Sequence, residues 1–93
     1  MGIVYVLKLQ NNKYYVGYTD DTNLDARMYR HKRGYGSSWT NKHKPIKLVR
    51  VIHNVDKLKE KQITIQYMKK YGYQNVRGYV WSSSYPIQKP RDV

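Results

Sequence analysis

Residues 3–19 read IVYVLKLQNNKYYVGYT, and this stretch decides the fold. Ile3 to Leu9 alternates apolar side chains on a β-branched background, and Lys13 to Thr19 has a similar pattern, so each segment predicts a β-strand. Asn11-Asn12 between them is a tight-turn signal, because asparagine tolerates the left-handed backbone of hairpin turns. The stretch therefore predicts a β-hairpin.

A helix is expected directly after the hairpin, over about residues 22–33. Asp20, Asp21 and Thr22 are its N-cap candidates, and Gly34 and Gly36 end it. The residues that follow, from Gly34 to Pro45, are polar and basic and predict a loop.

A third strand and a second helix complete the expected fold. The strand is Ile46 to His53, rich in Val, Ile and Leu. Asn54 or Asp56 caps a helix of about residues 56–71, which Gly72 closes. A short turn at 74–77 and an extended tail at 82–93 follow. The order β-β-α-β-α predicts an α+β domain with a small three-stranded antiparallel sheet flanked by helices.

The charge of the chain favours a polyanionic partner. Its 93 residues hold 18 Lys+Arg against 6 Asp+Glu, a net charge of +12, and nucleic acid is the commonest polyanion. No stretch approaches 18 consecutive apolar residues, so no membrane-spanning segment is expected. The absence of cysteine excludes disulfides and thiolate metal sites and fits a soluble intracellular protein.

Leu24, Arg27, Met28 and His31 fall on one face of the first helix, at i, i+3, i+4 and i+7. This face is half apolar, so Arg27 and His31 are expected to point toward the sheet. An inward arginine needs a partner, which is either an acid or carbonyl of the protein or a phosphate of a ligand.

Glu60 is the only glutamate, and it lies on a helix with many lysines. It starts a stripe at i, i+4, i+7, i+8 and i+11 that continues with Thr64, Tyr67, Met68 and Tyr71. Glu60 either makes a weak helical pair with Lys57 or Thr64, or it is an oxygen ligand for Mg²⁺ or Mn²⁺. Water and substrate phosphate would complete the coordination of such an ion.

Together these residues resemble a known family. Val4-Tyr5, Tyr15-Val16-Gly17, Arg27, His31 and Glu60 have the order and spacing of the GIY-YIG nuclease domain. The connecting segments, 34–45 and 68–78, are also similar to that family. The resemblance covers about residues 2–80 and departs from the family at Ile3 and at Tyr79, two positions where glycine is common. It implies a nuclease domain over residues 1–80, with residues 81–93 as an extended C-terminal tail of the same domain.

The resemblance also implies a mechanism, in which water attacks phosphorus with the help of Mg²⁺ or Mn²⁺. Tyr5 is then the proposed general base, although a phenol of pKa about 10 needs neighbouring cations to lower its pKa. Arg27 stabilises charge on the phosphate, Tyr15 orients phosphate or water, and Glu60 holds the metal. His31 either bonds Tyr5 or a phosphate, or has a structural role only.

Six residues are candidate contacts to nucleic acid, either from the basic loop or from cations elsewhere in the chain: Lys13, Trp39, Thr40, Lys42, Lys44 and Arg77. They position the backbone and carry no sequence reading. With the resemblance to a nuclease domain, DNA, duplex or branched, is the expected partner. Its choice of target would then rest on low sequence specificity, on structure-selective cutting or on a separate targeting protein.

The shared role of Tyr5 and Tyr15 places a condition on the hairpin. With a two-residue turn at Asn11-Asn12 the two tyrosines would point to opposite faces, because side chains alternate along a strand. We therefore predict an odd loop, such as residues 11–13, or a β-bulge.

Two functional classes remain open on the sequence. The first is a metal-dependent DNA endonuclease, and the second is a non-catalytic nucleic-acid-binding module on the same scaffold. A binding module would not need both Arg27 and Glu60. A third class, a generic binder of RNA or other polyanions, also fits the composition.

Overall fold

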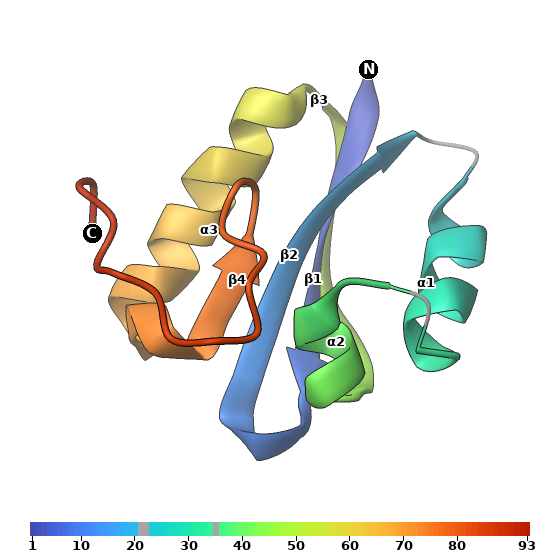
Figure 1. Cartoon of the computed structure of the whole chain (residues 1–93). Coiled ribbons are helices and arrows are strands. Elements are labelled where there is room, and N and C mark those ends of the chain that lie inside the picture. Colours follow the sequence, from blue (N-terminus) through green and yellow to red (C-terminus); the bar gives the residue numbers. More distant parts are fainter. Residues whose placement is uncertain (21–22, 35) are drawn as a thin grey trace.

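The computed structural model describes residues 1–20, 23–34 and 36–93. These residues form one four-stranded sheet in the order β3-β1-β2-β4 with helices on both faces (Figure 1). The elements are β1 (Gly2–Leu9), β2 (Lys13–Asp20), α1 (Leu24–Lys32), α2 (Ser38–Lys42), β3 (Pro45–Val55), α3 (Lys57–Tyr71) and β4 (Val76–Gly78), with 3-10 turns η1 (Gln10–Asn12) and η3 (Tyr73–Asn75). The predicted α+β class is confirmed.

The predicted three-stranded antiparallel sheet is wrong in the number of its strands. β1 pairs antiparallel with β2 and β3, as expected. However, β4 forms a fourth strand that runs parallel to Tyr14–Val16 of β2. A strand of three residues is too short to show periodicity, so the sequence indicated only a turn there. The helix α2, five residues long, was likewise hidden in the predicted loop.

The two longer helices lie close to their predicted positions. In α3 the side chain of Asp56 accepts a hydrogen bond from the backbone N–H of Leu58 at 3.0 Å, so Asp56 rather than Asn54 is the N-cap. Gly72 follows with φ 92°. Of the cap candidates for α1, Asp20 ends β2, whereas Asp21 and Thr22 lie outside the described residues. The N-cap position of α1 is Asn23.

The hairpin loop is odd, as predicted, but it begins one residue earlier. Leu9 pairs with Lys13, which leaves the three residues of η1 as the loop. Asn11 and Asn12 adopt φ angles of 64° and 58°, a left-handed conformation that asparagine tolerates better than most residues. Since Leu7 pairs with Tyr15 and Tyr5 pairs with Gly17, the side chains of Tyr5 and Tyr15 point to the same face.

The hairpin separates two clusters of buried side chains. On the face covered by α3 the cluster contains Val4, Val6, Tyr14, Val16, Ile63, Met68 and Val76. On the opposite face, under α1 and α2, it contains Tyr5, Leu7, Leu9 and Trp39, with Tyr15, Leu24 and Met28 packed against it. The alternation of strand side chains therefore assigns Tyr5 and Tyr15 to the face that α1 and α2 cover. Figure 1 shows these two helices on one side of β2 and α3 on the other.

The C-terminal segment packs against β4 and η3 through hydrogen bonds to buried donors. Arg77 is 1% exposed, and its guanidinium donates to the backbone carbonyls of Ser83 and Tyr85 at 2.8 and 3.1 Å. Gln74 accepts from the backbone N–H of Ile87 and donates to its carbonyl. The predicted extended tail is thus part of the packed structure.

The ring of Tyr5 lies directly over Gly17, its partner on β2. A Cβ atom built at Gly17 would overlap Cζ and the hydroxyl oxygen of Tyr5, so only glycine fits at this position. The second tyrosine motif therefore supplies a glycine because the first motif supplies a large ring opposite it.

We expect Gly17→Ala to lower the free energy of unfolding by about 1–3 kcal/mol, because the added methyl group displaces the Tyr5 ring. Urea denaturation measures this loss. In a double-mutant cycle the same change should cost much less in a Tyr5→Leu background, where no hydroxyl lies over the glycine. Equal costs in both backgrounds would contradict this account.

Candidate active site

Tyr5 and His31 form the buried centre of the site. Tyr5 comes from β1 and His31 from α1, and the Tyr5 hydroxyl lies 2.9 Å from His31 Nε2. The two residues are 0% and 2% exposed. The ring of Tyr15 packs against both, with ring centroids 6.3 Å from Tyr5 and 5.1 Å from His31. The structure therefore brings the two tyrosines and the histidine together.

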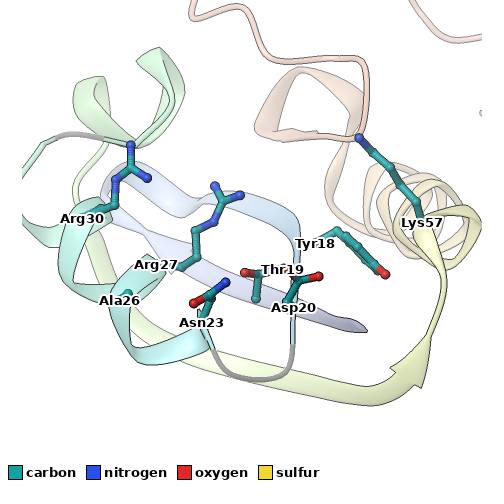
Figure 2. A pocket seen from close by; sticks show the side chains of 8 residues that line it. All are labelled: Tyr18, Thr19, Asp20, Asn23, Ala26, Arg27, Arg30 and Lys57. Carbon is teal, nitrogen blue, oxygen red and sulfur yellow. The ribbon is translucent and has the colours of Figure 1, made fainter. Parts of the chain in front are cut away.

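Two open clefts border this centre, and both are lined by Arg27 and Arg30. The first, of about 250 Å³, is also lined by Tyr15, His31, Gly36 and Ser37. The second, of about 440 Å³, lies between α1 and the start of α3, where Lys57 faces the arginines across Tyr18, Thr19 and Asp20 (Figure 2). Arg27 is exposed rather than turned fully inward, so its guanidinium is free to meet an anion in either cleft.

Glu60 is buried on α3, with 6% of its surface exposed. The helix that carries Glu60 covers the opposite face of the sheet from Tyr5. On that side of β2, the neighbouring strand β4 pairs only as far as Val16. The charge of the Glu60 carboxylate contributes to the raised pKa values of Tyr5 and Tyr15, and the charge of Arg27 lowers the pKa of Glu60 in turn. The carboxylate therefore belongs to the same electrostatic site as the two phenols and the arginine.

Burial shifts the pKa values of four groups in this site, which are Glu60, Tyr5, Tyr15 and His31. Burial raises the pKa of Glu60, opposed by Lys57, a backbone hydrogen bond from Tyr79 and Arg27. Burial also raises the pKa of Tyr5 well above its ordinary value and raises the pKa of Tyr15, and Arg27 offsets both shifts only in part. Burial together with the charges of Arg27 and Arg30 lowers the pKa of His31 from 6.5 to about 4. The condition that cations lower the pKa of Tyr5 is thus not met in the free protein, because desolvation outweighs Arg27.

The carboxylate of Glu60 fits the chemistry of a divalent-metal ligand. Among the buried side-chain oxygens and nitrogens of the described residues, only Glu60 Oε1 has no hydrogen-bond partner. A buried carboxylate oxygen without a partner is costly, and a hard cation would satisfy it. Over the described ranges there is no cluster of three or more His, Cys, Asp or Glu, so water and substrate would supply the other ligands.

Three of the six expected nucleic-acid contacts are not on the surface. Trp39 is 3% exposed and donates to the carbonyl of Tyr14, Thr40 is 0% exposed, and Arg77 is buried among carbonyls. Lys42 and Lys44 are exposed, whereas half-buried Lys13 donates to Asn75 Oδ1 at 2.6 Å. Only the three lysines have surface available for a backbone contact.

Sequence reasoning assigned no site role to Arg30, Lys57 and Ser37, and it named Thr40 only as a nucleic-acid contact. Arg30 and Lys57 line the larger cleft, and Ser37 and Thr40 stand behind His31. Arg30 lies off the Leu24–His31 stripe that drew attention to α1, and Lys57 was considered only as a helical partner of Glu60. The i, i+3 spacing of Arg27 with Arg30, and of Lys57 with Glu60, was the available signal.

Acidic partners for the basic surface are scarce. In the part of the chain that the structure describes, one ion pair is present, Lys61 with Asp92 at 3.5 Å. The cations around the clefts are therefore available to an external anion.

No helix in residues 1–20, 23–34 or 36–93 is long and apolar enough to cross a membrane.

Comparison with known proteins identifies the family of this chain. A model of the GIY-YIG catalytic domain matches residues 1–75. The chain therefore belongs to the GIY-YIG family, which is a family of nucleases.

Similar curated proteins come from staphylococci. The UPF0213 protein SH2523 of Staphylococcus haemolyticus is 41% identical over 46 residues, which is 50% of this chain and 54% of the relative. The UPF0213 protein SAV0488 of Staphylococcus aureus is 39% identical over the same shares. The chain thus aligns with about half the length of these relatives, and their names state no activity. No solved structure matches.

The lowered pKa of His31 predicts a loss of stability in acid. Its ordinary value is 6.5 and its folded value about 4, so below pH 6.5 the unfolded chain binds a proton that the folded protein excludes. The contribution of His31 to the free energy of unfolding is therefore fully present above pH 6.5. It is lost as the pH decreases toward 4, by up to about 3 kcal/mol. Urea denaturation at pH 7 and pH 4.5 measures this difference.

His31→Gln should show a smaller pH-dependent loss than the wild type, and His53→Gln, at an exposed position, should behave like the wild type. The raised pKa of Glu60 acts in the opposite direction, so all three proteins are best compared in a Glu60→Gln background as well. An identical pH dependence in His31→Gln and the wild type would refute the assignment to His31.

Proposed function

We propose that this chain is a metal-dependent DNA endonuclease with low sequence specificity or selectivity for DNA structure. The observation that carries the proposal is Glu60 Oε1, a buried carboxylate oxygen without a hydrogen-bond partner among the described residues, in the electrostatic site of Arg27, Tyr5 and Tyr15. A protein that only binds nucleic acid gains nothing from burying an acid beside the cations that attract phosphate.

In this proposal Arg27 binds the phosphate that is cut. Its guanidinium lines both clefts and is exposed, so it matches a phosphate with two parallel hydrogen bonds and stabilises the charge that develops on the oxygens during attack. Tyr15 lines the smaller cleft beside Arg27 and orients the phosphate or the attacking water.

Tyr5 and His31 act as one base. Because the pKa of Tyr5 is raised, its phenolate is scarce, and the proton needs an acceptor. His31 Nε2 lies 2.9 Å from the Tyr5 hydroxyl, so the phenol passes its proton to the imidazole as it takes one from the attacking water. The phosphate also offsets the charges of Arg27 and Arg30 that disfavour a protonated His31.

The base is closed to solvent in the free protein, since Tyr5 is 0% exposed. Tyr15 packs against Tyr5 and His31 and lines the cleft, so substrate binding must displace its side chain for water to reach Tyr5. The reaction is therefore coupled to a side-chain movement at the floor of the smaller cleft.

Glu60 is the residue that would hold Mg²⁺ or Mn²⁺. When bound, such an ion supplies Lewis-acid stabilisation of the phosphate and of the leaving oxygen. Nucleases of the GIY-YIG family are typically dependent on divalent metals, and among the residues that the structure describes the lone glutamate is the one with a buried side-chain oxygen that lacks a hydrogen-bond partner.

The two clefts outline a path for the DNA backbone. They share Arg27 and Arg30, and Lys57 lies on the far wall of the larger one (Figure 2). Arg30 and Lys57 therefore bind phosphates next to the one that Arg27 holds, while Lys13, Lys42 and Lys44 contact the backbone further away. Such contacts carry no base reading, which leaves targeting to DNA shape or to a partner protein.

We expect the purified protein to nick supercoiled plasmid with Mn²⁺ and not with chelator. Arg27→Ala and Glu60→Gln should each lower the rate at least about 100-fold, because each removes stabilisation of charge in the transition state. Lys69→Ala, at the opposite end of α3 from Glu60, is the matched control and should retain wild-type activity.

Metal binding offers a readout that is independent of turnover. Mn²⁺ should raise the thermal midpoint of the wild type and leave that of Glu60→Gln unchanged. DNA binding that survives in both variants without any nicking in the wild type would favour the non-catalytic binding module. Unchanged nicking in both variants would contradict the assigned site.

Salt dependence tests the backbone path. Arg30→Ala and Lys57→Ala should raise KM with little change in kcat, and each should reduce the log–log salt slope of DNA binding by about 0.9. Fluorescence anisotropy on a short duplex measures the slope, with Lys69→Ala again as the control. Slopes equal to that of the wild type would place the DNA elsewhere.

A further inference from the structure

Four residues form a continuous chain of hydrogen bonds that leads away from the proposed base. The Tyr5 hydroxyl meets His31 Nε2 at 2.9 Å, and His31 Nδ1 meets Thr40 Oγ1 at 3.1 Å. The Thr40 hydroxyl in turn donates to the backbone carbonyl of Ser37 at 3.1 Å. Tyr5, His31 and Thr40 are all buried, so bulk water does not compete for these bonds.

The direction of the chain follows from counting hydrogens. The Thr40 hydroxyl has one hydrogen, which is used in the bond to the Ser37 carbonyl. With its hydrogen on the Ser37 carbonyl, the Thr40 oxygen accepts at His31, so Nδ1 is the protonated nitrogen of a neutral imidazole. Nε2 then carries the lone pair that accepts the Tyr5 hydroxyl. The reverse arrangement, in which Thr40 donates to Nδ1, would put the proton on Nε2.

The other tautomer leaves a buried donor without a partner. With the proton on Nε2, the Tyr5 oxygen would accept and its own hydrogen would need another acceptor. Within residues 1–20, 23–34 and 36–93, His31 is the one hydrogen-bond partner of the Tyr5 hydroxyl, and Tyr5 is 0% exposed. An unsatisfied buried hydroxyl costs about 1–3 kcal/mol, enough to select the tautomer with the proton on Nδ1.

We propose that Thr40 is a positioning residue that holds His31 in the tautomer with the proton on Nδ1 and so directs the Nε2 lone pair at Tyr5. This inference rests on the proposed function, in which His31 accepts the Tyr5 proton. When that proton arrives, the Thr40 oxygen remains an acceptor for Nδ1–H, so the imidazolium keeps both of its hydrogen bonds.

The local backbone is built to hold Thr40 in place. Ser37 is the N-cap of α2, and its hydroxyl accepts from the backbone N–H of Thr40 at 3.2 Å. A Cβ atom at Gly36 would overlap Nδ1 of His31 and come within 2.8 Å of Thr40 Oγ1. The short helix α2 therefore presents one hydroxyl to one ring nitrogen, across a backbone position where a side chain has no room.

The ring nitrogens of His31 report the tautomer directly. Long-range ¹H–¹⁵N NMR on the labelled wild-type protein at pH 7 should show a protonated Nδ1 and an unprotonated Nε2. Thr40→Val has nearly the same shape and no hydroxyl, and it should shift His31 toward the Nε2–H form or a mixture. Thr40→Ser restores the hydroxyl and should restore the wild-type pattern.

Activity provides the second readout. Plasmid nicking should show kcat reduced about 10–100-fold in Thr40→Val with KM nearly unchanged, and within about threefold of the wild type in Thr40→Ser. A wild-type His31 with its proton on Nε2 overturns the proposal without any variant, so a failure of Thr40→Val to fold does not protect it. An unchanged tautomer and unchanged kcat in Thr40→Val overturn it as well.

The two readouts separate this inference from the function on which it rests. If the wild type cuts no DNA with any metal, the nuclease proposal fails, whereas the NMR pattern of the wild type and Thr40→Val still decides whether Thr40 sets the tautomer. If the protein cuts DNA and the tautomer does not respond to Thr40, the nuclease proposal stands and the inference is refuted.

Discussion

The packing of the Tyr5 ring over Gly17 is the contact on which the remaining geometry depends. It requires that the two residues face each other across the hairpin, and the three-residue loop η1 provides this register. A loop shorter by one residue would turn Tyr15 away from Tyr5 and remove the ring that packs on His31. The position of α1 follows, because its buried His31 and its partly buried Leu24 and Met28 pack on the same face.

Electrostatic cost is concentrated at one place in this molecule. Most of the basic side chains are exposed and solvated. Tyr5, His31 and Glu60, in contrast, are buried, and burial disfavours the charged form of each. Such an arrangement lowers the stability of the free protein, since one buried acid oxygen has no partner within the described residues. Ligands that bring both an anion and a cation would relieve this cost at once, which links substrate binding to stabilisation of the fold.

The sequence predicted the parts that have a strong local pattern. Alternation defined β1 and β2, and the polar residues before a helical stripe located α3 and its cap Asp56. The sequence also indicated Arg27, His31 and Glu60, because a charged residue on a partly apolar stripe needs a reason. It did not reveal β4 or α2, because elements of three and five residues are too short to show periodicity, and it did not reveal the Thr40–His31 bond, because that bond joins side chains of two different helices. The burial of Trp39 and Arg77 was missed because aromatic and basic residues in a polar segment resemble surface contacts.

Arg77 makes the C-terminal segment part of the packed fold, although this segment lies outside the residues that match the family. The family match ends at residue 75, yet the guanidinium of Arg77 donates to the carbonyls of Ser83 and Tyr85, and its Cζ lies 4.3 Å from the ring centroid of Trp39 in α2. A fragment cut at the edge of the matched region would lack Arg77, and one cut just beyond β4 would leave its charge under-solvated. We therefore expect a piece that keeps the segment up to Ile87 to be more stable than one that ends at the edge of the matched region.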